Sequence, residues 1–237
     1  MTRKHDSEQL LVDDFTKVYG KTLQRGEGVL ILNEIKTAWG IVDILAIHYN
    51  KAKLLKRCES INKMPPVFSN LSAYAMVYLS ENPVCTVQDL GNYLKTNNGP
   101  LSQVLETLRS RGLINIYKNG NVRICTKDKT FVIKDILAFE AKISKWKRAV
   151  EQAERYLWFT NSSYIIVPNF TSSTINAIRL ECANRGIGLI VQSRSKSQSF
   201  RIIKEPLYKV RIDSFFSWKL NELLIDRSIS NGRKHPS

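Results

Sequence analysis

Two acids and one lysine carry the clearest chemical potential in this chain, because each lies in a run that is otherwise apolar. Asp43 lies in GIVDILAI, and Glu140 and Lys142 lie in LAFEAKIS. Successive residues of a strand face opposite sides, so Glu140 and Lys142 point the same way. An unpaired buried charge is costly, so each of these groups needs a partner. A divalent cation between Asp43 and Glu140, with Lys142 offsetting the remaining negative charge, would satisfy all three.

Helices and strands on both sides of these residues follow from the spacing of apolar positions. Alternation of strands with helices after residue 130 predicts parallel pairing of the strands through crossover helices. The predicted helices are 7–19, 145–159, 172–184 and 215–225, and the predicted strands are 28–35, 40–49, 131–143, 163–168, 187–192 and, at an edge, 200–203.

A segment of different character separates Asp43 from Glu140. Residues 50–66 are basic and end in Pro65-Pro66, which predicts a linker. Residues 68–126 favour three helices followed by a hairpin at Lys118-Asn119-Gly120-Asn121, since Asn-Gly is a strong hairpin signal. The run LETLRSRGLINIYKNGNVRI resembles the recognition helix and wing of winged helix-turn-helix domains.

The outer segments resemble the PD-(D/E)xK nuclease superfamily. The likeness consists of an acid in a Gly-x-x-Asp strand, Glu-x-Lys on a second strand, and a helix, KWKRAVEQAERY, with Gln152 and Tyr156 four residues apart. It implies an α/β fold with a restriction-endonuclease-like mixed central sheet flanked by helices, interrupted by the winged-helix domain. Val42 stands where many members have proline, and the insertion makes the pairing of the two acidic strands an inference.

The resemblance implies hydrolysis of phosphodiester bonds with Mg²⁺, or Mn²⁺ as a substitute. Asp43 and Glu140 would bind the metal. Lys142 would orient or deprotonate a water or stabilise developing charge, and Gln152 would position Lys142 or a phosphate. A further acid is expected from Glu34, which falls opposite Asp43 if Lys36 opposes Ile41; Glu8 in the first helix is the competing candidate.

Nucleic-acid contacts are expected from both parts of the chain. In the nuclease part, the expected backbone contacts are Lys145, Arg148, Arg155 and Tyr156. In the inserted domain, Asn98, Ser102 and Gln103 would lie near base edges, and Lys118 and Arg123 on phosphates. The alternative is that the inserted domain docks a protein.

The predicted domain boundaries follow these changes of character. They are a nuclease core at 1–49 and 129–227, a basic linker at 50–66, a winged helix-turn-helix domain at 67–128, and a disordered tail at 228–237.

Composition agrees with a polyanionic partner. The 237 residues carry a formal net charge of +15, which favours nucleic acid. The four cysteines form no CxxC pair, which argues against a zinc site and favours a reducing, cytoplasmic compartment. No apolar run is long enough for a membrane span or a secretory signal.

The sequence therefore predicts a Mg²⁺-dependent DNA endonuclease, in a restriction, mobile-element or repair setting, acting as a homodimer or with a partner subunit. A non-catalytic DNA-binding regulator that retains the fold is the alternative, and an RNA-directed nuclease is a second one.

Overall fold

The computed structural model describes residues 3–21, 26–37, 40–61, 63–193, 199–209 and 214–234, with the backbone alone at 3–7 and 232–234. The chain forms two compact units. The first, which we call the sheet unit, comprises residues 1–48 and 134–211, and the second, the helical unit, comprises 49–133 and 212–237. The mixed α/β architecture with a mixed central sheet flanked by helices confirms the predicted fold class at this level.

The sheet unit is built on six strands in the order β1-β2-β6-β7-β8-β9. Strands β6, β7 and β8 pair in parallel, as the alternation of strands and helices predicted, and β9 is antiparallel to β8. Its elements are α1 (Arg3–Tyr19), β1 (Glu27–Thr37), β2 (Gly40–Asn50), β6 (Ile133–Ala141), α7 (Trp146–Tyr156), β7 (Ser162–Val167), α8 (Ser172–Arg185), β8 (Gly188–Gln192) and β9 (Phe200–Lys204).

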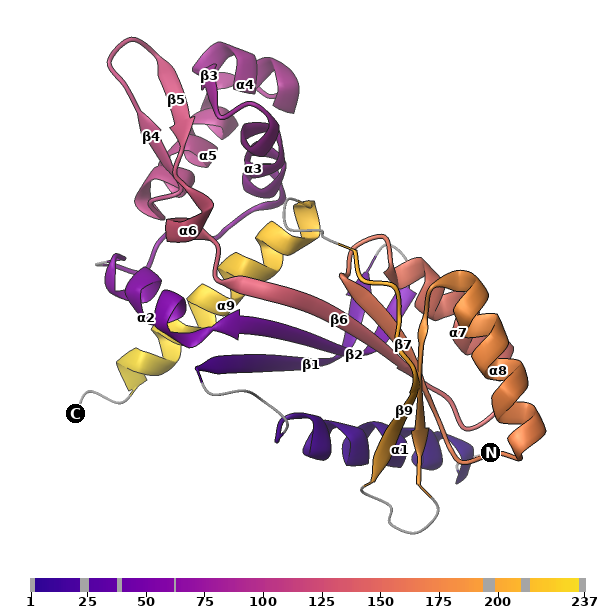
Figure 1. Ribbon diagram of the computed structural model, residues 1–237. Coiled ribbons are helices and arrows are strands. Elements are labelled where there is room, and N and C mark those ends of the chain that lie inside the picture. The colour runs from indigo at the N-terminus through magenta and orange to yellow at the C-terminus, as the bar shows by residue number, and fades with distance from the viewer. Residues whose placement is uncertain are drawn as a thin grey trace. The chain divides into compact units, whose positions relative to one another are not determined.

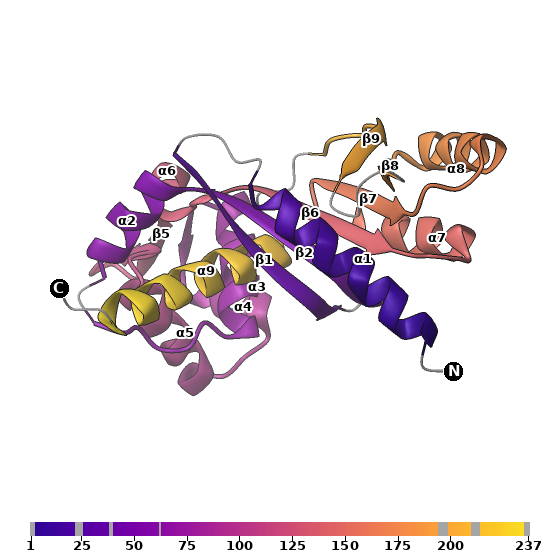
Figure 2. The same ribbon diagram turned by 90° about the horizontal axis from the view of Figure 1, so that it is seen from below.

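Helices cover both faces of this sheet (Figures 1 and 2). On one face, Leu11 and Phe15 of α1 pack against Ile44 of β2 and Phe139 of β6. On the other face, α7 and α8 pack against alternate residues of β7 and β8. All six residues of β7 are buried, because a strand between two helical layers has no face toward solvent.

Among the described residues, the helical unit contains five longer helices and the short helix α6. It also contains a three-stranded antiparallel sheet in the order β3-β5-β4. Thr86 caps α4, with a reciprocal hydrogen bond from its backbone to Asp89. The elements are α2 (Lys51–Glu59), α3 (Asn70–Glu81), β3 (Val84–Thr86), α4 (Val87–Leu94), α5 (Asn98–Ser110), β4 (Ile114–Ile116), β5 (Asn121–Ile124), α6 (Lys127–Thr130) and α9 (Phe215–Lys234).

A buried ion cluster attaches α9 to the end of α5. The guanidinium of Arg111, which is fully buried, donates to Glu222 at 2.8 Å, to both carboxylate oxygens of Asp226, and to the carbonyl oxygen of Pro66. Arg57 of α2 lies 3.8 Å from Glu222. Because these charges are paired inside the unit, α9 is part of its core.

Three predicted boundaries are wrong. Residues 51–59 of the predicted linker form α2, whose Leu54 is buried. The last helix does not end at residue 225 but continues to Lys234, through most of the predicted disordered tail, because Ile229 is buried. That helix also belongs to the helical unit and not to the sheet that carries Asp43. No helix in the described ranges is long and apolar enough to cross a bilayer.

Candidate active site

Strand alternation places the two acids on the same face of the sheet. Ile44 and Ala46 of β2, and Phe139 and Ala141 of β6, pack on the α1 side. Asp43 and Glu140 alternate with these residues, so they face the opposite side, where α7 lies. Strands β2 and β6 are neighbours in the sheet, which brings together two acids that are far apart in the chain.

The amine of Lys142 lies among three carboxylates from three different elements. Its Nζ is 3.1 Å from Glu140 Oε1, 3.5 Å from Asp43 Oδ2, and 3.5 Å from Glu8 Oε2 of α1. Glu140 is fully buried, whereas Asp43 and Lys142 are about one-quarter and one-fifth exposed. The cluster therefore opens to solvent on the side of Asp43 and Lys142.

Asp43 is fixed to the strand beside it through its side chain. The backbone N–H of Ala141 donates to Asp43 Oδ2 at 2.8 Å. Burial raises the pKa of Asp43 above its usual range, although the charge of Lys142 and this hydrogen bond act in the opposite direction. Burial and the neighbouring charge of Asp43 raise the pKa of Glu140 to about 7. Because the two acids disfavour each other's ionisation, a positive charge beside them would stabilise their ionised forms.

Lys142 is held in its charged form. Burial alone would lower its pKa, but the carboxylates of Glu140, Asp43 and Glu8 outweigh burial and raise it. Its Nζ also donates to the carbonyl oxygen of Ala141 at 3.1 Å. A charged amine stabilises negative charge and orients a water, and it does not accept a proton.

Tyr156 supports the cluster from inside the protein and is not exposed on the surface. Its side chain is fully buried, and its hydroxyl lies 2.9 Å from Glu140 Oε2 and 2.6 Å from the carbonyl oxygen of Ile41. The predicted contact of Tyr156 with a nucleic-acid backbone is therefore wrong, because a fully buried ring cannot reach it. The hydroxyl instead orients the carboxylate of Glu140.

Gln152 lies one helical turn before Tyr156 on the same side of α7. Its Oε1 is buried and accepts no hydrogen bond from protein groups. Glu140 Oε1 is also buried, but the amine of Lys142 lies 3.1 Å from it and satisfies it. A buried oxygen without a donor, such as that of Gln152, is rare in folded proteins and points to a missing donor.

Glu8, and not Glu34, supplies the third acid of the cluster. Glu34 is exposed and forms no ion pair with Lys142 in the described part of the chain. Its φ of 53° lies in the left-handed region, and both Asn33 and Glu34 are exposed, so the alternation of β1 is interrupted there. Glu34 is therefore not the additional acid of the cluster, whereas the competing candidate Glu8 lies beside Lys142.

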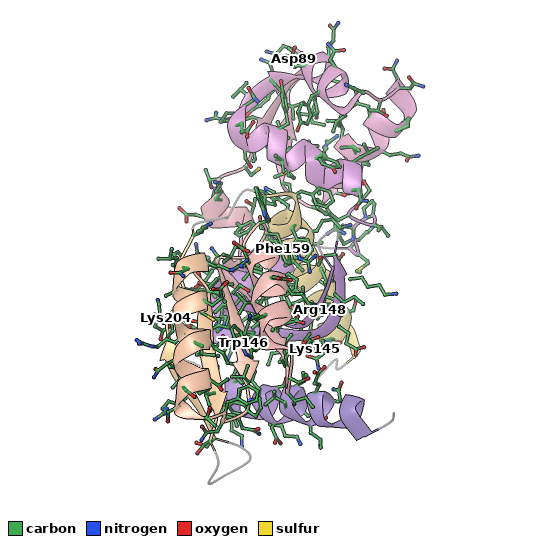
Figure 3. All side chains as sticks on the ribbon, turned by 90° about the vertical axis from the view of Figure 1, so that its right-hand side faces the viewer. Asp89, Lys145, Trp146, Arg148, Phe159 and Lys204 are labelled. Atoms are coloured by element: carbon green, nitrogen blue, oxygen red, sulfur yellow. The ribbon has the colours of Figure 1, made fainter. Side chains whose placement is uncertain are left out.

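The outer face of α7 is cationic. Lys145, Arg148 and Arg155 are exposed and, with Trp146, Lys147 and Glu151, line an open hollow of about 720 Å³. Figure 3 labels Lys145, Trp146 and Arg148 at the start of this helix. Only two residues lie between Lys142 and Lys145, so the cations follow directly in the chain from the carboxylate cluster.

The predicted contacts of the inserted domain lie in the helical unit. Asn98, Ser102 and Gln103 are exposed on α5, and Lys118 and Arg123 are exposed on the hairpin of β4 and β5. The carboxylate cluster is made entirely of residues of the sheet unit.

The donor set of the cluster suits a hard divalent cation. Asp43 and Glu140 offer carboxylate oxygens, which Mg²⁺ prefers, and the carbonyl oxygen of Ala141 lies beside them. Among the described residues, no group of three carboxylate, histidine or cysteine side chains forms a complete metal-binding group by itself. The amine of Lys142 lies between the acids of the cluster. When all three acids are ionised, their negative charge exceeds the charge of Lys142 by two, which one Mg²⁺ ion would balance.

Searches against protein-family models, curated proteins and solved structures give no match for this chain.

Proposed function

We propose that this protein is a metal-dependent endonuclease that hydrolyses phosphodiester bonds of DNA, with Mg²⁺ bound by Asp43 and Glu140. The observation that carries the proposal is the amine of Lys142 within 3.5 Å of acids on β2, β6 and α1. The order of the parts also agrees with the PD-(D/E)xK resemblance. An acid on one strand is followed by Glu-x-Lys on its neighbour, then a helix with glutamine, then a further strand.

Each side chain has a distinct part in this mechanism. When bound, Mg²⁺ would polarise the phosphoryl oxygen and lower the pKa of a bound water. Lys142 stabilises the charge that develops as the water oxygen bonds to phosphorus and the bond to the sugar oxygen breaks. Tyr156 holds Glu140 in place, and Gln152 presents an unsatisfied oxygen on the same side. The cations of α7 bind the phosphates that flank the cleaved bond.

Within this proposal, α3, α4, α5 and the sheet β3-β5-β4 form a winged helix-turn-helix domain inserted into a restriction-endonuclease-like core. Three helices followed by a hairpin support this interpretation, and so does the position of these elements in the chain, between β2 and β6.

Cleavage of supercoiled plasmid and of branched DNA tests the proposal. With Mg²⁺ we expect cleavage by the wild type, none with EDTA, and a rate at least roughly 100-fold lower for Asp43→Asn and for Lys142→Ala. Two substitutions on α1 are matched controls that should cleave like the wild type: Lys17→Ala at an exposed position, and Asp13→Asn at a half-buried position that accepts a hydrogen bond from Gln9.

Cleavage that persists in EDTA or in both site variants would contradict the proposal. Tight, salt-dependent DNA binding without cleavage by the wild type would favour the non-catalytic regulator, and cleavage of RNA alone would favour the RNA-directed alternative.

A further inference from the structure

The cations of α2 divide into two groups with different environments. Arg57 is turned inward and lies 3.8 Å from the buried Glu222. Lys51, Lys53 and Lys56 are exposed on the helix. The first turn of α2 has no acidic residue that would offset Lys51 and Lys53. The helix therefore presents three amines to solvent, spread around its exposed side.

Helix α6 adds two further amines to the same surface. It lies beside α2 in both views (Figures 1 and 2), and Lys53 Nζ is 3.2 Å from Asp128 Oδ1 of α6. Lys127 and Lys129 flank Asp128 and are exposed. We call the five lysines of this surface the basic patch: Lys51, Lys53, Lys56, Lys127 and Lys129.

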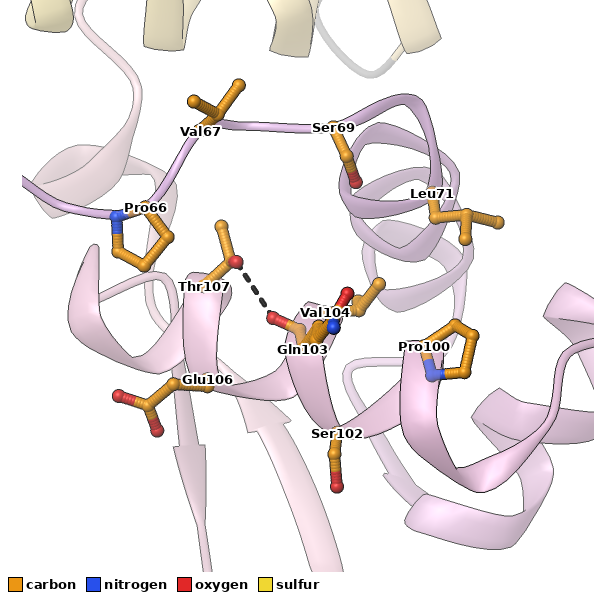
Figure 4. A pocket seen from close by; sticks show the side chains of 10 residues that line it. All are labelled: Pro66, Val67, Ser69, Leu71, Pro100, Ser102, Gln103, Val104, Glu106 and Thr107. Carbon is orange, nitrogen blue, oxygen red and sulfur yellow. Dashed lines mark hydrogen bonds between the residues drawn. The ribbon is translucent and has the colours of Figure 1, made fainter.

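Helix α5, the predicted recognition helix, has a different surface. Its exposed residues before Arg109 include no cation, and they include Glu106. Along one side it borders a largely apolar hollow of about 580 Å³, shown in Figure 4, to which Val67, Pro100 and Val104 contribute. Helix α2 borders an apolar hollow of similar size, about 590 Å³, so the difference between the two helices lies in their cations. Without a cation before Arg109, α5 offers little attraction for a phosphate backbone.

We infer that the basic patch on α2 and α6, and not α5, is the surface through which the helical unit binds nucleic acid. Five amines with two nearby acids, Glu59 and Asp128, complement the charge of a phosphate backbone. Lysine is a point charge that contacts phosphates, and it lacks the planar fork that reads guanine, so binding here is independent of base sequence.

An anionic membrane would also attract amines, but the composition of the patch disfavours it. Among large apolar residues of α2, Leu54 is buried and Leu55 is exposed. One exposed leucine is too little apolar surface for a helix to insert into a bilayer.

Binding of a labelled DNA duplex at increasing salt tests the inference. All proteins carry Asp43→Asn, so that binding is measured without cleavage. In the patch variant, Lys51, Lys56, Lys127 and Lys129 are replaced by Gln. We expect the patch variant to bind DNA at least roughly tenfold more weakly near 0.15 M salt. Its binding should also depend less on salt. The slope of the logarithm of the binding constant against the logarithm of salt concentration should become shallower by about 0.9 for each phosphate that the variant no longer neutralises. Scrambling the DNA sequence should change neither result.

Two control variants separate location from net charge. Lys17, Lys36, Arg179 and Arg201, all exposed in the sheet unit, are replaced by Gln to remove the same charge elsewhere. Asn98, Ser102 and Gln103 are replaced by Ala to test α5. Both control variants should bind within about twofold of the parent, and thermal unfolding should show that all variants are folded.

Equal binding by the patch variant and the parent would overturn the inference, as would loss of binding in the α5 variant alone. Binding to anionic vesicles but not to DNA or RNA would also overturn it. The inference does not require cleavage: a protein that never cuts can still lose binding through the patch, and an active nuclease can bind without it.

Discussion

Lys142 is the residue on which the chemistry of the carboxylate cluster converges, and two of its partners differ in what they can do. Asp43 is partly exposed and bonded to a backbone N–H, whereas Glu140 is enclosed and bonded to Tyr156. Alternation along β6 sufficed to predict that Glu140 and Lys142 share a side. It could not predict the role of Tyr156, because helical spacing indicates the direction of a side chain and not its depth.

Replacing Tyr156 by Phe should weaken the use of the metal without unfolding the protein. The ring is retained, while Glu140 loses the hydroxyl that orients it. Loss of such a supporting hydrogen bond typically costs about 10–100-fold in metal affinity or activity. Cleavage measured against Mg²⁺ concentration should show a higher half-saturating concentration. Tyr208→Phe, which removes the hydrogen bond to Asp135, is the control and should leave this value unchanged.

Metal-free protein should become less stable as the pH rises from about 5 to 8. Glu140 has a pKa near 7 in the folded state and an ordinary value of 4.5 in the unfolded chain. Between these values the folded state holds a proton that the unfolded state has lost, so stability falls with pH, by roughly 3 kcal/mol when complete. Denaturant unfolding in EDTA should show this slope. An identical slope in Glu140→Gln would contradict the assignment to Glu140.

At the scale of elements, β1 and α1 compete to supply the third acid. Sequence spacing favoured Glu34, since two strands of a regular hairpin pair residue by residue. In the structure Glu34 has a positive φ and is exposed, and Glu8 of α1 lies beside Lys142 instead. Local backbone irregularities of this kind leave no reliable mark in a single sequence.

Glu8→Gln should therefore reduce cleavage, by about tenfold, because it removes one of three charges around Lys142. Glu34→Gln should cleave at the wild-type rate within about twofold. Initial rates on plasmid DNA at saturating Mg²⁺ distinguish the two residues, and the reverse result would favour Glu34 as the third acid.

Helices and strands with regular patterns of apolar residues could be predicted. Two segments, α2 and the end of α9, were predicted wrongly because their sequences carry conflicting signals. Strands β6, β7 and β8 are apolar runs bounded by polar segments, and their parallel pairing followed from the helices between them. In α2, three outward lysines and a following Pro-Pro obscured the inward pair Leu54 and Arg57. In α9, serine, asparagine and Gly232 suggested an end that the burial of Ile229 overrides.

At the scale of the whole molecule, the set of segments that make up the helical unit was the least predictable feature, because it depends on contacts between residues far apart in the chain. Arg111 and Glu222 meet across the chain, and each would look like an ordinary surface charge in the sequence. A partner for a buried charge cannot be inferred until the fold places one beside it.

Arg111→Ala should destabilise the helical unit by about 3–5 kcal/mol, since Glu222 would remain buried without its main partner. Hydrogen exchange measured by segment should then show faster exchange in α5 and α9, with β7 unchanged. Lys53→Ala breaks an exposed ion pair and should cost less than about 1 kcal/mol. Equal effects of the two substitutions would contradict the structural role of the buried cluster.

The membership of α9 in the helical unit has a consequence for biosynthesis. A ribosome releases all of β1 to β9 before it begins α9, so the sheet can complete itself while the enclosed domain still lacks the helix that neutralises Arg111. Residues 49–133 must therefore wait until α9 has been translated. A stop codon between β9 and α9 would damage the helical unit first and spare the strands that carry Asp43 and Glu140.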